Sequence, residues 1–181
     1  MTKNVIAFGA SNSKQSINKQ FAQFAANKLI NTEVIILDLN DFELPIYSID
    51  LEKKSGIPDN AIRFSKFIKE SDAIIISLAE YNGLYTSAFK NLWDWISRID
   101  GMNIWSGKPM FLLSTSPSKK ERNYVMKVSL YLFPAFGANI LASYVLPSFN
   151  HYFKDNKIIE ENHARNFESE LHKFQEHINQ I

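Results

Sequence analysis

The sequence contains no cysteine, and this absence excludes several kinds of chemistry. Without a thiol, the chain cannot form a disulfide, use a thiolate nucleophile, or bind an iron–sulfur cluster or zinc through cysteine. Any redox reaction therefore needs a bound cofactor. The lack of disulfides also fits a reducing compartment, and we expect a cytoplasmic protein.

The sequence also lacks an excess of either charge, because 20 lysines and arginines stand against 19 acidic residues. Such a balance produces no broad field that would attract nucleic acid or an anionic membrane. The first 13 residues contain only a short apolar run, which is neither a signal peptide nor a membrane span. We expect no nucleic-acid or membrane partner, so any anion must be bound by local geometry.

Five short apolar runs predict β-strands that are buried on both faces, because their hydrophobic residues are continuous rather than alternating. These runs are residues 5–10, 34–37, 73–78, 110–114 and 140–146. Helical spacing of apolar residues lies between and after them, at 17–29, 62–68, 89–96, 122–133 and 164–181. The longest irregular connection covers residues 39–60.

Strands that alternate with helices predict a parallel sheet with helices on both faces. Five strands and five helices in 181 residues favour one domain, residues 1–181, with a flavodoxin-like doubly wound α/β fold of strand order 2-1-3-4-5. In such sheets, ligands bind beyond the carboxyl ends of the strands. The loops after Ala10, Leu78 and Ser114 are therefore the candidate site.

The first of these loops, residues 11–18, is rich in hydroxyl and amide side chains and precedes an amphipathic helix. A phosphate there would meet free backbone N–H groups and the positive end of the helix dipole, with Lys14 nearby. Alternatively, Ser16 or Asn18 merely caps the helix. Neither GxxxxGKS nor GxGxxG is present, so neither an NTPase nor a Rossmann domain is indicated.

The second loop, residues 79–87, contains Asn82-Gly83, a pair that is typical of a tight turn, and Thr86 or Ser87 can cap the following helix. The loop would present N–H groups and aromatic edges to a flat heterocycle such as a flavin ring, although a plain turn is the alternative. Trp93 and Trp95 point in different directions on that helix, which predicts one core residue and one oligomer contact.

Other candidate sites are weaker. His163, His172 and His177 are spaced nine and five residues apart, which does not place them on one helix face as metal ligands, so we assign them to a solvated polar face and predict no metal site. No serine is marked as the nucleophile of a Ser–His–Asp triad.

The two loops resemble the motifs of the NADPH-dependent FMN reductase family, which includes flavin, quinone, azo-dye and chromate reductases. The family pattern G-S-x-R-x-x-S-x-N falls on residues 10–18, and P-E-Y-N-G-x-x-P-x-x-L-K-N-x-x-D-W-x-S-R falls on residues 79–98 with most positions kept. Weaker similarity at 107–109, 114–117 and 133–138 extends the resemblance over nearly the whole chain.

The resemblance implies an oxidoreductase that passes a hydride from NADPH or NADH to bound FMN, and then electrons to a small acceptor, by a ping-pong mechanism without a catalytic side chain. It implies a phosphate site made of Ser11, Ser13, Ser16, Ile17 and Asn18. It implies that Glu80, Tyr81, Asn82 and Gly83 line the flavin ring, largely through backbone groups, and that Ser116 and its neighbours close the other side of the ring. It also implies a homodimer or homotetramer, with residues 80–98 near the subunit interface.

Four positions depart from the family motifs. Ala10 replaces glycine, Ser13 replaces arginine, and Ala79 and Thr86 replace prolines. Loss of the arginine removes a charged phosphate donor, which bears on flavin affinity and on the choice between NADPH and NADH. Residues 118–122 stand where many relatives have glycines, which would reshape the acceptor pocket.

Two other functions remain open. A flavodoxin-type electron carrier would not oxidise NAD(P)H by itself, and such carriers tend to be strongly acidic, unlike this near-neutral chain. A flavin-free regulatory or interaction domain could keep the fold without the chemistry.

Overall fold

The structure is a computed structural model that describes residues 2–101, 103–119 and 123–181. Its centre is a five-stranded parallel sheet with the order β2-β1-β3-β6-β7, which confirms the predicted strand order. The strands are β1 (Lys3–Gly9), β2 (Thr32–Leu37), β3 (Ala73–Leu78), β6 (Pro109–Thr115) and β7 (Asn139–Leu146). Burial on both faces is confirmed for the inner strands, but β2 and β7 are edge strands and are partly exposed.

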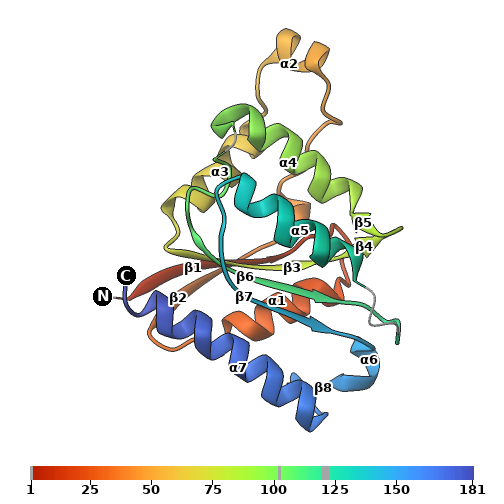
Figure 1. The fold of residues 1–181 in the computed structure, drawn as a ribbon. Helices are drawn as coiled ribbons and strands as arrows, with labels where there is room; N and C mark the ends of the chain where they lie inside the picture. The colour runs from red at the N-terminus through yellow and green to blue at the C-terminus, as the bar shows by residue number, and fades with distance from the viewer. Residues whose placement is uncertain (1, 102, 120–122) are drawn as a thin grey trace.

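Helices cover both faces of the sheet, as predicted (Figure 1). On one face lie α3 (Asp59–Glu70), α4 (Ser87–Asp100) and α5 (Tyr124–Ala135), and on the other lie α1 (Ile17–Ala26) and α7 (Glu161–Ile178). Alternating residues of β1 enter the two cores: Ile6 and Phe8 pack on the first side, and Val5 and Ala7 on the second. No helix in the described ranges is long and apolar enough to cross a membrane.

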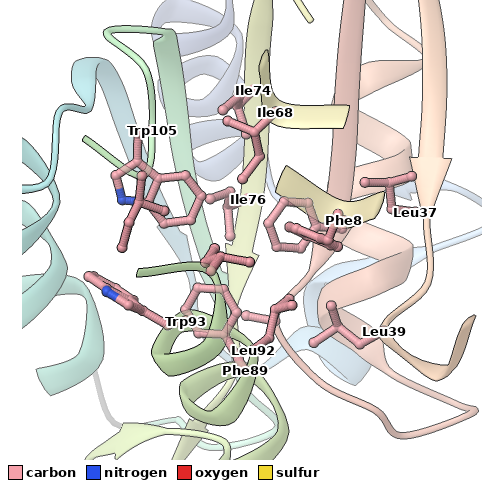
Figure 2. Close-up of a cluster of buried hydrophobic side chains, with 14 of the residues drawn as sticks. Phe8, Leu37, Leu39, Ile68, Ile74, Ile76, Phe89, Leu92, Trp93 and Trp105 are labelled. Atoms are coloured by element: carbon pink, nitrogen blue, oxygen red, sulfur yellow. The ribbon is translucent and has the colours of Figure 1, made fainter. Parts of the chain in front are cut away.

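The core under α4 is unusually aromatic (Figure 2). Trp93 packs edge-to-face against Phe133 and Trp105, while the Trp95 indole N–H donates to the Pro45 carbonyl at 2.7 Å. Trp93 is 5% exposed and Trp95 is fully buried. The prediction that one of the two is an oligomer contact is therefore wrong, because this chain itself covers both sides of α4.

Two helical segments lie inside the stretch 39–60, which we expected to be irregular. They are η1 (Leu39–Asp41) and α2 (Ile49–Ser55), and α2 projects beyond α4 (Figure 1). The Ser48 hydroxyl caps α2 by accepting from the Leu51 N–H. Because α2 has no fully buried side chain, its sequence lacks the apolar periodicity that would have identified it.

Shorter elements complete the described chain. The hairpin β4 (Glu80–Tyr81) and β5 (Leu84–Tyr85) follows β3, and its turn was predicted from Asn82-Gly83. After β7 come α6 (Phe149–Tyr152), β8 (Phe153–Lys154) and β9 (Lys157–Ile158), which the sequence pattern did not indicate.

Candidate functional site

The first loop of the candidate site is positioned by Gly9, the last residue of β1. A Cβ atom on Gly9 would lie 2.4 Å from the Lys19 backbone nitrogen and 2.7 Å from the Lys19 Cα. Only glycine therefore allows the start of α1 to cross so close to the end of the strand. Sequence reasoning missed this residue, although a glycine that ends a strand shortly before a helix was a usable signal.

Ser16 begins α1 as its N-cap, which confirms the capping alternative for this residue. Its hydroxyl oxygen accepts from the Lys19 N–H at 3.1 Å, and its own N–H donates to the Ser13 carbonyl at 3.1 Å. Among the residues that the structure describes, none accepts a hydrogen bond from the N–H of Ile17 or Asn18. Two backbone donors and the Ser16 O–H are thus available to an anion at the helix N-terminus.

The side chain of Asn18 joins three parts of the site rather than facing a ligand. Its Oδ1 accepts from the Ser77 hydroxyl at 2.7 Å and from the Thr115 N–H at 3.0 Å, while its Nδ2 donates to the Thr115 carbonyl at 3.1 Å. Asn18 is buried. Its amide therefore fixes α1 to the carboxyl ends of β3 and β6, and only its backbone N–H remains for a phosphate.

Thr86 connects the first loop to the second. As the N-cap of α4 it accepts from the Phe89 N–H at 3.2 Å, and its hydroxyl donates to the Ala10 carbonyl at 2.9 Å. A proline at this position, as in the family motif, would lack the hydroxyl that makes both contacts. This departure from the motif therefore adds a contact between the loops.

The hairpin turn lies at the tip of the second loop. Asn82 and Gly83 have φ angles of 54° and 85°, as a two-residue hairpin turn requires. The Glu80 carboxylate accepts from the Val125 N–H at 2.9 Å, so it ties the hairpin to the start of α5. Tyr81 is 55% exposed, which leaves an aromatic ring and the turn backbone open at this edge.

The third loop is fixed by a chain of hydrogen bonds that leads back to β3. The Ser114 hydroxyl donates to the Leu78 carbonyl at 2.7 Å, and the Asn123 amide donates to Ser114 at 2.6 Å. Ser116 is half-buried, and its carbonyl accepts from the Phe149 N–H at 2.9 Å. Of the predicted segment 118–122, residues 120–122 lie outside the described residues.

All ten predicted flavin-binding residues follow neighbouring strands at the same edge of the sheet, and their role in binding stays a prediction.

One histidine of α7 is less exposed to solvent than we expected. His163 is half-buried and its Nδ1 lies 2.9 Å from the Tyr144 hydroxyl, so it is not simply solvated. Burial raises the pKa of that Tyr144 hydroxyl. In the described ranges, no group of three or more histidine or acidic residues is placed to hold a metal ion.

Because Ser16 is both cap and donor, replacing it tests both roles. We expect Ser16→Ala to lower the free energy of unfolding by about 1 kcal/mol through loss of the cap. We also expect roughly tenfold weaker FMN binding, because a hydrogen bond to a charged group is lost. Thermal unfolding and flavin titration measure the two effects separately, and unchanged FMN affinity would show that Ser16 is only a cap.

Residues 3–151 match the family described as NADPH-dependent FMN reductase. A quinone reductase of Pseudomonas putida KT2440 is 34% identical over 104 residues, which is 58% of this chain and 55% of the relative. A 2-hydroxy-1,4-benzoquinone reductase of a Burkholderia species is 35% identical over 104 residues, which is 57% of this chain and 55% of the relative. The alignments thus span about half the length of these curated relatives.

Solved structures resemble the chain over a longer stretch. The flavoenzyme NAD(P)H:(acceptor) oxidoreductase FerB from Paracoccus denitrificans is 25% identical with a TM-score of 0.76, and the match covers 98% of both chains. An NADH:FMN oxidoreductase in its apo form is 16% identical with a TM-score of 0.69, covers 97% of this chain and 90% of its own, and shows the shared fold alone. On the family match over residues 3–151, the chain belongs to the NADPH-dependent FMN reductase family.

Proposed function

We propose that the protein is an FMN-dependent oxidoreductase that takes electrons from NADPH or NADH and passes them to a small acceptor, such as free flavin or a quinone. The observation that carries this proposal is the joining of three loops at the carboxyl edge of the sheet. Asn18 ties the first loop to the third, and Thr86 ties the first to the second. In a doubly wound sheet this edge is where cofactors bind.

The donor set of the first loop fits a phosphate monoester. The N–H groups of Ile17 and Asn18, together with the Ser13 and Ser16 hydroxyls, would hold its oxygens at the positive end of α1. Serine stands at position 13 where the motif has arginine, so Lys14 is the only charged side chain in residues 11–18, and hydrogen bonds and the helix dipole would provide most of the attraction for the dianion.

The second and third loops fit the two sides of a flat ring. Backbone groups of Tyr81, Asn82 and Gly83 would line one side and Ser116 the other, while Glu80 contributes only its backbone because its carboxylate is bonded to α5. When bound, the flavin supplies the chemistry of accepting a hydride and passing electrons on. The chain's part is to hold the ring, to offer N–H groups to negative charge on it, and to leave one face open to donor and acceptor in turn.

The test begins with the purified protein. We expect bound flavin by absorption, FMN rather than FAD by mass spectrometry of the released cofactor, and NADPH or NADH oxidation with a quinone or free flavin as acceptor. A shared site for donor and acceptor predicts parallel lines in double-reciprocal plots. Flavin content without NAD(P)H oxidation would favour the electron carrier, and failure to bind any flavin would favour the flavin-free domain. NAD(P)H is a metabolite of the cytoplasm, and we propose that location.

We further propose that residues 1–181 act as one domain and assemble as a homodimer or homotetramer, with residues 80–98 near the subunit interface. The tryptophans do not support this, but exposed aromatic and aliphatic side chains do. They lie on the hairpin and the adjoining α5: Tyr81, Leu84, Tyr124, Leu130 and Tyr131. Such a surface on a symmetric contact would provide anchors for a second copy.

Tyr131 is 81% exposed and lies two turns beyond Tyr124 on α5. We expect Tyr131→Glu to weaken self-association at least roughly tenfold, since a charge would replace an aromatic anchor. Light scattering over a concentration series measures this, with Ile181→Glu as a control at an exposed apolar residue of the C-terminus. A wild type that stays monomeric at micromolar concentration would contradict the assembly proposal.

A further inference from the structure

A cavity of about 630 Å³ lies beside the first loop, and none of the ten predicted flavin-binding residues lines it. It is bounded by the first loop, the segment after β2 and the first turns of α4. Its lining includes Asn12, Lys14, Phe42, Ile46, Ala88 and Leu92. This volume falls in the range of sites for small ligands and cofactors.

The outer wall of this cavity is held in place by α4. Asn91 donates from Nδ2 to the Leu44 and Pro45 carbonyls at 3.3 and 3.0 Å and accepts from the Tyr47 N–H at 2.8 Å. The Trp95 indole donates to the Pro45 carbonyl as well. The wall formed by residues 44–47 is thus preformed, so ligand binding would lose little conformational entropy in ordering it.

Polar and apolar side chains line the cavity in similar measure. Of the apolar ones, Phe42 and Leu92 are almost completely buried, whereas Ile46 is 86% exposed. A mixed lining of this kind suits a ligand that combines a flat ring with polar groups. The Asn12 amide and the Glu43 carboxylate in this lining can pair with ring nitrogens and ribose hydroxyls, respectively.

Lys14 is the cation of this cavity. Lys19 is paired with Asp38, and Lys90 with Asp94, but no described carboxylate pairs with Lys14, which is exposed. Burial alone would raise the pKa of Asp38, yet the hydrogen bonds from Lys19 and Asn40 outweigh this effect and lower that pKa. The Lys19 ammonium is therefore already paired with the Asp38 carboxylate. Lys14 lines the cavity, whereas the serines of the first loop do not.

The cavity also lies next to the hairpin edge where the flavin ring would lie. Ser87 lines both this cavity and a second one, which is bounded by the hairpin residues Tyr81, Asn82 and Tyr85. The two cavities thus adjoin at the start of α4.

We propose that this cavity binds the adenosine end of the NADPH donor and that Lys14 pairs with the 2′-phosphate. This inference rests on the proposed function. It assigns the selectivity for NADPH over NADH to Lys14 instead of the arginine that the family motif has at position 13. Glu43 also lines the cavity and, as a carboxylate, would accept from a ribose hydroxyl and repel a 2′-phosphate, so the preference requires that Lys14 outweigh Glu43.

The test uses 2′,5′-ADP and 5′-AMP, which carry the adenosine end with and without the 2′-phosphate, in calorimetric titrations of the FMN-loaded protein. We expect 2′,5′-ADP to bind roughly tenfold more tightly than 5′-AMP, and Lys14→Ala to remove this preference. The control Lys154→Ala changes an exposed lysine of β8 and should leave the preference intact.

A second pair of variants tests the cavity itself. Ala88→Leu places a larger side chain in the cavity and should weaken both nucleotides at least roughly tenfold, while Ala88→Ser, which conserves the volume, should not. FMN affinity is measured on every variant and should change less than twofold.

Three outcomes would overturn the inference. One is weaker FMN binding by Lys14→Ala with an unchanged preference for 2′,5′-ADP, which would assign Lys14 to the flavin phosphate. Another is FAD binding that is lost in Ala88→Leu, which would assign the cavity to a flavin dinucleotide. The third is unaltered nucleotide binding in both variants. Because these titrations involve no turnover, they can succeed even if NADPH oxidation fails, and the two proposals fail separately.

Discussion

Replacing Gly9 by alanine is expected to lower the free energy of unfolding by about 3 kcal/mol and to weaken FMN binding more than tenfold. The new Cβ would lie 2.4 Å from the Lys19 nitrogen, a backbone atom that cannot move without α1. Because the flexible end of a side chain is not involved, the helix must shift as a unit. The N–H groups of Ile17 and Asn18 would then no longer point where a phosphate is held.

Thermal unfolding and flavin titration measure both effects, and a fall in Tm of roughly 10 °C corresponds to this loss of stability. The control is Ala10→Gly at the neighbouring position, where the family motif has glycine. That change adds no atom and should cost about 1 kcal/mol or less. If Gly9→Ala were as stable as the wild type, the close crossing of β1 and α1 would be wrong.

Asn18→Ala is expected to lower the free energy of unfolding by about 4 kcal/mol. The change removes one amide but leaves three buried groups without a partner: the Ser77 hydroxyl and the N–H and carbonyl of Thr115. Each unsatisfied group costs about 1–3 kcal/mol, and partial relaxation keeps the total below the sum. Urea unfolding measures the loss, and a decrease under 1 kcal/mol would contradict the central role of Asn18.

The variant Asn18→Asp should make the free energy of unfolding depend on pH. This dependence separates the contribution of the Asn18 Nδ2 donor from that of the Oδ1 acceptor. Its carboxylate keeps the contacts with Ser77 and the Thr115 N–H but faces the Thr115 carbonyl oxygen, so burial and repulsion should raise its pKa above the ordinary value of about 3.9. Protonation restores a donor to that carbonyl. The variant should therefore be most stable at low pH and lose stability as the pH rises through the folded-state pKa, relative to Asn18→Ala.

Periodicity was sufficient to predict the five strands and the five main helices, because each buries a continuous or evenly spaced apolar face, and the strand order followed from the rule for doubly wound sheets. It failed at α2, which buries no whole side chain, and at the edges of the sheet, where neighbours are absent on one side. It also failed at Trp93 and Trp95, since helix geometry alone does not reveal that residues 44–47 cover one side of α4 and α5 covers the other.

The position of the candidate site was predicted from the sequence, but the long-range contacts of its side chains were not. Fold rules correctly placed three loops at one edge, and the position of Ser16 before an apolar pattern indicated a cap. The Asn18 amide could not be assigned from sequence, because its partner Thr115 is 97 residues away and only the folded sheet brings them together. Likewise, the contact of the Glu80 carboxylate with the start of α5 could not be assigned from sequence, while the prediction that the Glu80 backbone lines the ring stays a prediction.

The projecting α2 and the loop before it have a consequence for how such a protein can diversify. The loop residues Leu44 and Ile46 line the cavity beside the first loop, whereas α2 does not line it and has no fully buried residue. Leu44 and Leu51 pack partly against the core, but exposed positions such as Ile46 can change without opening it. The residues that join the three loops, by contrast, are buried and shared between strands. Substitutions at exposed wall positions can therefore alter which molecules the cavity admits while the joined loops at the edge of the sheet stay in place.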